Sequence, residues 1–155
     1  MEYVFVVGII CLTGLLLLLE FFYLFIMSKQ TEEWLCVEGK IDKSKMDVYY
    51  GYDANSYKTN VQYQYIVEEK KYVSKRIYYG DYTLKTFPCS VKKIVNKYTK
   101  GKTVLVYYNP QHPNKSVLET GVHTVIYRGL VAGILVLLLS VVMFLKESFF
   151  TSFFQ

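Results

Sequence analysis

Histidine and cysteine are scarce in this 155-residue chain, so few side chains are available for metal or thiol chemistry. The two histidines, His112 and His123, have no cysteine, histidine or carboxylate at the spacing that metal ligands require. Cys11 lies in an apolar segment, where we expect it to pack as a small hydrophobic side chain. Cys36 and Cys89 also lack ligand spacing, and they are either free thiols or the two halves of one disulfide. The sequence therefore predicts neither a metal site nor a cofactor.

The sequence also lacks the motifs that mark most catalytic sites. Gly101 and Lys102 have no upstream glycine and no strand–loop–helix context, so they do not form a phosphate-binding loop. No serine stands in a nucleophile-elbow setting, and no cysteine is plausibly paired with a histidine. The carboxylate pairs at residues 32–33 and 68–69 fall in connecting segments, where exposure to solvent explains them. We therefore predict no catalytic residues and a protein that is not an enzyme.

Charge is nearly absent from a long stretch at the start of the chain. Residues 3–27 are apolar apart from Glu20. At ~1.5 Å per residue, a helix of this length is enough to cross the ~30 Å hydrocarbon core of a bilayer. A cleaved signal peptide is the alternative, but no basic segment precedes the run, the run is too long, and no small-residue cleavage site follows it. The segment is therefore predicted to be a transmembrane helix.

A second apolar segment covers residues 122–145 and is interrupted by Arg128 near its start. It is predicted to be a second transmembrane helix. Gly129 and Gly133 are four residues apart, a spacing that lets helices pack closely, although glycine is common enough in membrane helices for the pair to arise by chance. Residues 146–155 follow as a tail with four phenylalanines, a composition suited to the headgroup region.

The charged residues Glu20 and Arg128 fall at matching positions in the two predicted helices. Glu20 lies seven residues before Met27, and Arg128 lies six residues after Val122. At ~1.5 Å per residue, both side chains start roughly 10 Å below the same membrane face. An unpaired charge at that depth costs about 1–3 kcal/mol. We predict that the two form an intramembrane ion pair; the alternative is that each side chain extends separately to the headgroups.

The residues between the helices, 34–121, are predicted to form a small antiparallel β domain with one amphipathic helix. Val61, Tyr63 and Tyr65 alternate with polar residues, which is typical of a half-buried strand. The expected strands cover residues 34–44, 59–67, 72–79, 103–108 and 116–119. Residues 86–98 carry apolar side chains at helical spacing, with Thr86 placed to cap the helix and Pro88 in its first turn.

Residues 47–58 are predicted to form a loop, and this loop is unusually rich in tyrosine. Tyrosine offers a large rigid surface and a hydroxyl group, and it is enriched at protein interfaces. The candidate partner surface consists of Tyr49, Tyr50, Tyr52 and Tyr57. The alternative is that these rings cover the sheet of their own domain.

Several motifs in the middle of the chain resemble the bacterial family known as domain of unknown function 3592. They begin with Trp34 and the Gly39-x-Ile41 element, and continue with Tyr63-x-Tyr65-x-Val67 and Tyr72. The most specific element is Val104-x-Val106-Tyr107-Tyr108-Asn109-Pro110, preceded by Tyr98-x-x-Gly101 and followed by Pro113 and residues 116–121. The resemblance covers roughly residues 34–121. It implies a small β-rich domain carried on two membrane helices, and it implies no activity.

The middle of the chain is basic, with 16 Lys and Arg against 10 Asp and Glu between Ser28 and Tyr127. A solvated surface is the simplest interpretation, and attraction to anionic lipid headgroups is the next. Basic residues interleaved with tyrosines could also bind nucleic acid, but we predict no nucleic-acid partner for a domain beside a bilayer.

The sequence predicts an integral membrane protein whose β-rich domain binds a protein partner or a second copy of the chain. An immunity or accessory membrane protein of a bacterium is the most concrete version. The alternatives are a membrane-anchored structural protein that senses lipid or envelope components, and an envelope enzyme.

The expected location is the bacterial inner membrane, crossed twice. Lys29, Lys40, Lys43 and Lys45 follow the first helix closely, whereas no Lys or Arg precedes it. By the positive-inside rule, this distribution favours a cytoplasmic domain with both termini outside.

Overall fold

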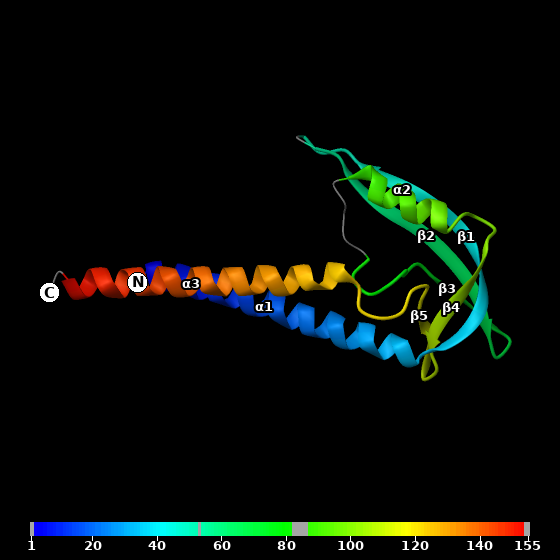
Figure 1. Ribbon diagram of the computed structural model, residues 1–155, viewed down its shortest axis with the longest axis horizontal. Coiled ribbons are helices and arrows are strands. Elements are labelled where there is room, and N and C mark those ends of the chain that lie inside the picture. The colour runs from blue at the N-terminus through cyan, green and yellow to red at the C-terminus, as the bar shows by residue number, and fades with distance from the viewer. Residues whose placement is uncertain (1, 53, 82–86, 154–155) are drawn as a thin grey trace. The chain divides into compact units, whose positions relative to one another are not determined.

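The computed structural model describes residues 2–52, 54–81 and 87–153 (Figure 1). The chain divides into two compact units. One unit contains residues 1–26 together with residues 124–155, and the other contains residues 27–123. The predicted boundary between membrane segments and β domain therefore falls close to the observed division.

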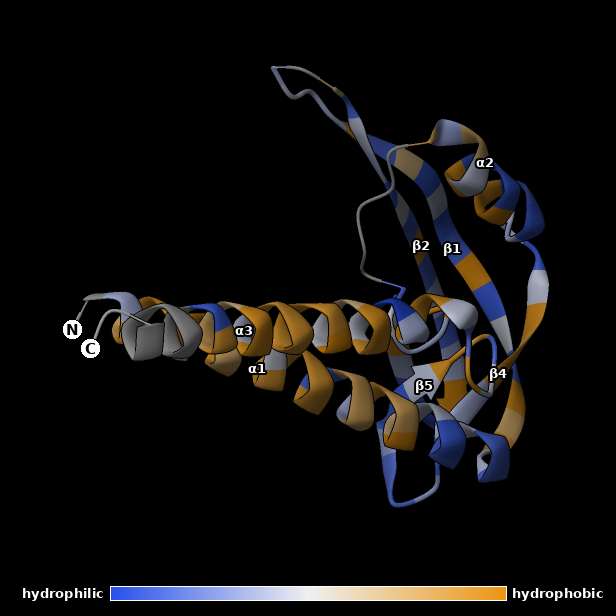
Figure 2. Ribbon diagram, turned by 60° about the vertical axis from the view of Figure 1, so that its left-hand side comes forward, coloured by the Kyte–Doolittle hydropathy of each residue, from blue (hydrophilic) through white to orange (hydrophobic). Residues whose placement is uncertain are grey.

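The first unit is built from two long apolar helices, α1 (Glu2–Gln30) and α3 (Tyr127–Phe153). Both are coloured as hydrophobic along most of their length in Figure 2. Both are long and apolar enough to cross a membrane, and most of their side chains are exposed. A core helix of a soluble protein would bury those side chains, so this exposed apolar surface indicates anchoring in a membrane.

The predicted start of the second helix at Val122 is wrong. Gly121 has a positive φ of 82°, a conformation that glycine adopts without strain. A short 3-10 turn, η2 (Thr124–Ile126), then precedes α3, which begins at Tyr127. The predicted end of the first helix at Met27 is too early. α1 runs on to Gln30 and continues into the 3-10 turn η1 (Thr31–Glu33).

The second unit contains one five-stranded antiparallel sheet in the order β3-β2-β1-β4-β5. The strands are β1 (Leu35–Tyr49), β2 (Ser56–Val67), β3 (Lys70–Ser74), β4 (Thr103–Asn109) and β5 (His112–Val117). Three of the four strand pairs join strands that are consecutive in the sequence. The fourth pair joins β1 to β4, which meet after the chain has passed through α2 (Pro88–Lys97).

The core lies between one face of the sheet and α2, which contacts both β1 and β2. Val61, Tyr63 and Tyr65 are buried on β2, so the predicted alternation of that strand is confirmed. Val91 and Tyr98 contribute the apolar side of the helical segment. Because the apolar residues of both elements face each other, burying them stabilises sheet and helix together.

Several predicted element ends are corrected by the structure. The first two strands are longer than expected, so the predicted loop at residues 47–58 is instead the end of a hairpin; among the described residues of that range, 50–52, 54 and 55 lie outside the strands. β3 ends at Ser74 and not at residue 79, and β5 begins at His112 and not at residue 116. Pro88 opens α2 as predicted, while Thr86 lies outside the described residues.

Candidate functional site

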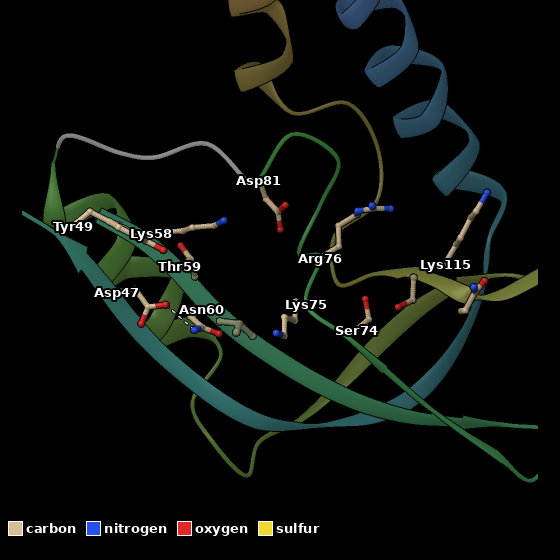
Figure 3. Close-up of a pocket in the computed structure, with 13 residues that line it drawn as sticks. Asp47, Tyr49, Lys58, Thr59, Asn60, Ser74, Lys75, Arg76, Asp81 and Lys115 are labelled. Atoms are coloured by element: carbon tan, nitrogen blue, oxygen red, sulfur yellow. Dashed lines mark hydrogen bonds between the residues drawn. The ribbon is translucent and has the colours of Figure 1, made fainter. Parts of the chain in front are cut away.

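An open polar pocket of about 530 Å³ lies where β3 leaves the edge of β2 (Figure 3). β3 pairs with β2 only between Tyr63 and Val67. No other described strand pairs with that edge of β2, so residues 56–62 leave it open. Lys58, Thr59, Asn60 and Val61 from this stretch line the pocket. Side chains from β1, β2, β5 and the segment after β3 complete the wall.

The charges in the pocket wall are mostly positive. The lining cations are Lys58, Lys75, Arg76 and Lys115, and the lining carboxylates are Asp47 and Asp81. Asp47 accepts a hydrogen bond of 2.7 Å from Asn60 and lies 2.9 Å from the Lys45 ammonium group. Hydrogen bonding from Lys45 and Asn60 lowers the pKa of Asp47, so its charge is already compensated.

Asp81 projects into the pocket between Lys58 and Arg76 in Figure 3. Its carboxylate accepts a hydrogen bond from the backbone N–H of Ile77, which fixes the loop that follows β3. Burial raises the pKa of Asp81, although backbone N–H groups and the charges of Arg76 and Lys58 oppose the shift. The guanidinium group of Arg76 lies 4.5 Å from the centre of the Tyr79 ring.

A second group of titratable side chains surrounds Glu119, at the end of the β domain. One oxygen of Glu119 accepts bonds from Lys97 at 2.8 Å and from the Tyr98 hydroxyl at 2.6 Å. Burial favours the protonated carboxyl, but these two donors outweigh it and lower the pKa of Glu119. Burial, together with the bond to Glu119, raises the pKa of Tyr98.

His123 belongs to the same group. Its ring stacks on Tyr78 with the centroids 4.0 Å apart, and its Nε2 atom lies 3.7 Å from Glu119. Nε2 is buried and has no hydrogen-bond partner among the described residues. Burial lowers the pKa of His123, and Glu119 only partly opposes this effect.

The four candidate tyrosines do not form one surface. Tyr50 is 85% exposed and Tyr52 is fully exposed, and both lie outside the strands. Tyr49 is opposite Ser56 and Tyr57 is opposite Val48 in the hairpin register. Side chains of directly paired residues share a face and successive residues alternate, so Tyr49 and Tyr57 point to opposite faces.

Both glycines of the predicted packing motif lie on the side of α3 that contacts α1. A β-carbon at Gly133 would lie 2.8 Å from the Leu18 side chain and 3.2 Å from the carbonyl oxygen of Gly14. A β-carbon at Gly129 would lie 3.7 Å from the carbonyl oxygen of Leu17, an ordinary contact. The closest approach therefore involves Gly133 together with Gly14, which the sequence did not single out.

Glu20 and Arg128 are both exposed on their helices. The rings of the adjacent residues Phe21 and Tyr127 meet at a tilt with their centroids 5.9 Å apart, so the two charges are at a similar level along the helix pair. Their pairing stays a prediction.

The side chains considered for metal and thiol chemistry lie apart. All three cysteines are free and exposed, so Cys36 and Cys89 are not joined in this structure. His112 is exposed on β5 and is not part of the Glu119 group that contains His123. Among the described residues, no three His, Cys, Asp or Glu side chains are grouped so that they could hold a metal ion.

Sequence reasoning missed the polar pocket because its charges come from separate parts of the chain. Lys58, Lys75 and Lys115 are far apart in sequence, and only the strand register brings them to one wall. The dipeptide Lys75-Arg76 directly after a strand was the one local signal. The Glu119 group was missed for the same reason, since Lys97 and Glu119 are 22 residues apart.

The comparisons with known proteins match the β domain. The family described as a domain of unknown function, DUF3592, matches residues 37–123. This range covers more than half of the chain, and it confirms the resemblance carried by the Val104–Pro110 motif. No curated protein and no solved structure matches the chain. The chain therefore belongs to the DUF3592 family.

Proposed function

We propose that this protein is a membrane-anchored binding module whose β domain recognises a protein partner through the tip of the β1–β2 hairpin. The observation that carries the proposal is the exposure of Tyr50 and Tyr52. Large aromatic side chains at such positions gain no burial within their own domain, whereas they are favoured at the centre of protein interfaces.

The hairpin also holds these rings on an ordered support. β1 and β2 stay paired out to Tyr49 and Ser56, next to the residues that carry the two rings. A β-carbon at Gly51 would collide with the carbonyl oxygen of Ala54. An aromatic side chain has few rotatable bonds and loses little conformational entropy on binding, which favours recognition.

The proposal includes the setting of the module. We place the protein in the inner membrane of a bacterium, crossing it twice, with the β domain in the cytoplasm and activity by binding and not by catalysis. The lysines that follow α1 support this orientation. An immunity or accessory membrane protein is the concrete form that we propose.

Site-directed photocrosslinking in cells tests this proposal. A benzophenone side chain at position 50 or 52 should give one crosslinked product, and the same group at the exposed Lys92 should not. The double variant Tyr50→Ser/Tyr52→Ser, without the crosslinking group, should no longer co-purify in detergent with the partner found in the crosslinked product. The control Leu105→Ser, at an exposed strand residue, should still co-purify with it. Loss in both variants, or crosslinking from neither tip position, would refute recognition through the tip.

A further inference from the structure

The polar pocket beside the open edge of β2 contains positive charge that the described carboxylates do not neutralise. Asp47 is already paired with Lys45, which lies outside the pocket wall. Asp81 is then the one remaining carboxylate among the described residues of the pocket wall, which contains four cations. The salt bridges among the described residues involve none of these four cations.

The same wall supplies neutral hydrogen-bond donors. Thr59 and Ser74 each bring a hydroxyl group, and Asn60 brings the amide N–H that it does not donate to Asp47. The Ser116 hydroxyl is buried and already bonded to the Tyr63 hydroxyl at 3.1 Å. Arg76 holds its guanidinium group over the ring of Tyr79 and brings planar N–H donors to the pocket wall. A planar N–H edge binds phosphate and carboxylate oxygens with two parallel bonds.

We propose that this pocket binds the phosphate group of an anionic ligand. A phosphate carries three terminal oxygens and up to two negative charges, so it can use Lys58, Lys75 and Arg76 together with the hydroxyl donors. A volume of about 530 Å³ is larger than a phosphate group and is in the range of small-molecule sites. The phosphate belongs either to a soluble phosphorylated compound or to a phospholipid headgroup, and the two sources differ in the experiment below.

Asp81 acts as the internal competitor for this ligand. Its carboxylate projects between Lys58 and Arg76, where it partly offsets the positive charge of the empty pocket (Figure 3). An entering phosphate must share these cations with it. Removing the charge of Asp81 should therefore strengthen binding, a response opposite to that of a residue that contacts the ligand.

Calorimetric titration of the full chain in neutral detergent with pyrophosphate, at fixed ionic strength, tests the site. The double variant Lys58→Gln/Lys75→Gln should weaken binding at least tenfold. Lys92→Gln/Lys93→Gln removes the same charge from the exposed side of α2 and should change the affinity less than twofold. Equal weakening in both variants would show attraction by net charge alone and would overturn the site, as would the absence of saturable binding to the wild type.

Two further measurements use variants that keep the fold. Asp81→Asn retains an acceptor for the Ile77 N–H group and should tighten pyrophosphate binding severalfold, whereas Glu38→Gln on an exposed strand position should not. Unchanged or weaker binding in Asp81→Asn would contradict the competitor role. Citrate should bind at least tenfold more weakly than pyrophosphate, and equal binding would overturn the assignment to phosphate.

The source of the phosphate is distinguished in lipid nanodiscs. If the ligand is a headgroup, phosphatidylglycerol in the nanodisc should weaken pyrophosphate binding by competition relative to phosphatidylcholine alone, and Lys58→Gln/Lys75→Gln should abolish the difference. If the ligand is soluble, pyrophosphate affinity should be the same in both nanodiscs. A difference that persists in the double variant would show that lipid acts elsewhere and would overturn the headgroup source.

Discussion

At the scale of single residues, Gly39 is the position where the sheet leaves least room for a side chain. A β-carbon there would lie 2.6 Å from a methyl group of Val106 and 2.8 Å from the carbonyl oxygen of Gln64. The second contact is with backbone, which cannot rotate away. This close approach explains the glycine of the Gly39-x-Ile41 element by packing and not by a turn.

We therefore predict that Gly39→Ala lowers the free energy of unfolding by about 1–3 kcal/mol, because the added methyl group overpacks the strand pairing. Thermal unfolding of the detergent-solubilised chain measures the effect. Gly8→Ala is the control, since a β-carbon at Gly8 meets nothing within 4 Å, and it should be neutral or slightly stabilising. A Gly39→Ala protein as stable as the wild type would show that the neighbouring strands can move apart enough to accommodate the added methyl group.

His123 should make the stability of the β domain depend on pH in mildly acidic solution. Burial lowers its pKa in the folded state from the ordinary value of 6.5, while Lys97 acts in the same direction and Glu119 and Asp81 oppose it. As pH falls below about 6.5, the unfolded chain therefore binds the proton before the folded chain does, and stability is lost.

Melting temperatures at pH 7.5 and 5.5 test this effect. The wild type should melt at a lower temperature at pH 5.5, and His123→Phe should reduce that decrease while keeping a ring against Tyr78. The lowered pKa of Glu119 causes loss only below its unfolded value of about 4.5, outside this window. The raised pKa of Asp81 has the opposite sign, since it adds stability as pH falls. Equal decreases in wild type and variant would assign the acid sensitivity to other groups.

At the scale of elements, the two glycines of α3 should differ in importance although they share one motif. Alanine at Gly133 would press on Leu18 and on the backbone of Gly14, so the helices must separate or shift. We predict a loss of about 1 kcal/mol or more for Gly133→Ala and less than about 0.5 kcal/mol for Gly129→Ala. Thermal unfolding in detergent compares the two, and equal effects would show that the motif does not act through α1–α3 contact.

The Glu20–Arg128 pair is the other prediction for this helix pair. Glu20→Gln or Arg128→Gln alone should lower stability in detergent by about 0.6–2 kcal/mol, because the remaining charge loses its partner within an apolar surface. The exchanged variant Glu20→Arg/Arg128→Glu should recover part of that loss. Additive losses without recovery would show that each side chain reaches the headgroups independently.

The elements were predictable from the sequence where local pattern and packing agree. The alternation of Val61, Tyr63 and Tyr65 marked β2, and the helical spacing that ends at Tyr98 marked α2, since both faces are buried in the same core. The tyrosine-rich stretch was misjudged because Tyr, Gly, Asn and Asp together are typical of loops. Pairing with β1 overrides this composition, so Tyr57 continues β2. Strand order and the polar pocket depend on register between distant strands, which no local pattern reports.

At the scale of the whole molecule, the two units divide the properties of the chain between them. One unit consists of apolar helices with exposed side chains, and the other holds the sheet, the polar pocket and the Glu119 group. Every candidate binding feature therefore lies within residues 27–123, nearly the range that the family match covers. The compartment that contains this unit decides which partner and which phosphate compound can reach it.

Labelling with a membrane-impermeant maleimide determines that compartment. Cys36 and Cys89 are free and exposed, so either can serve as a reporter in a Cys11→Ser background with the other cysteine replaced by serine. We predict that both are protected in intact cells and react after permeabilisation, because the lysines that follow α1 favour a cytoplasmic domain. Ser148→Cys, with the three native cysteines replaced, should give the opposite result, since the candidate membrane span Thr124–Lys146 lies between it and the domain.

Labelling of Cys36 in intact cells together with protection at position 148 would reverse the orientation. Labelling at both positions in intact cells would mean that α3 does not cross the membrane.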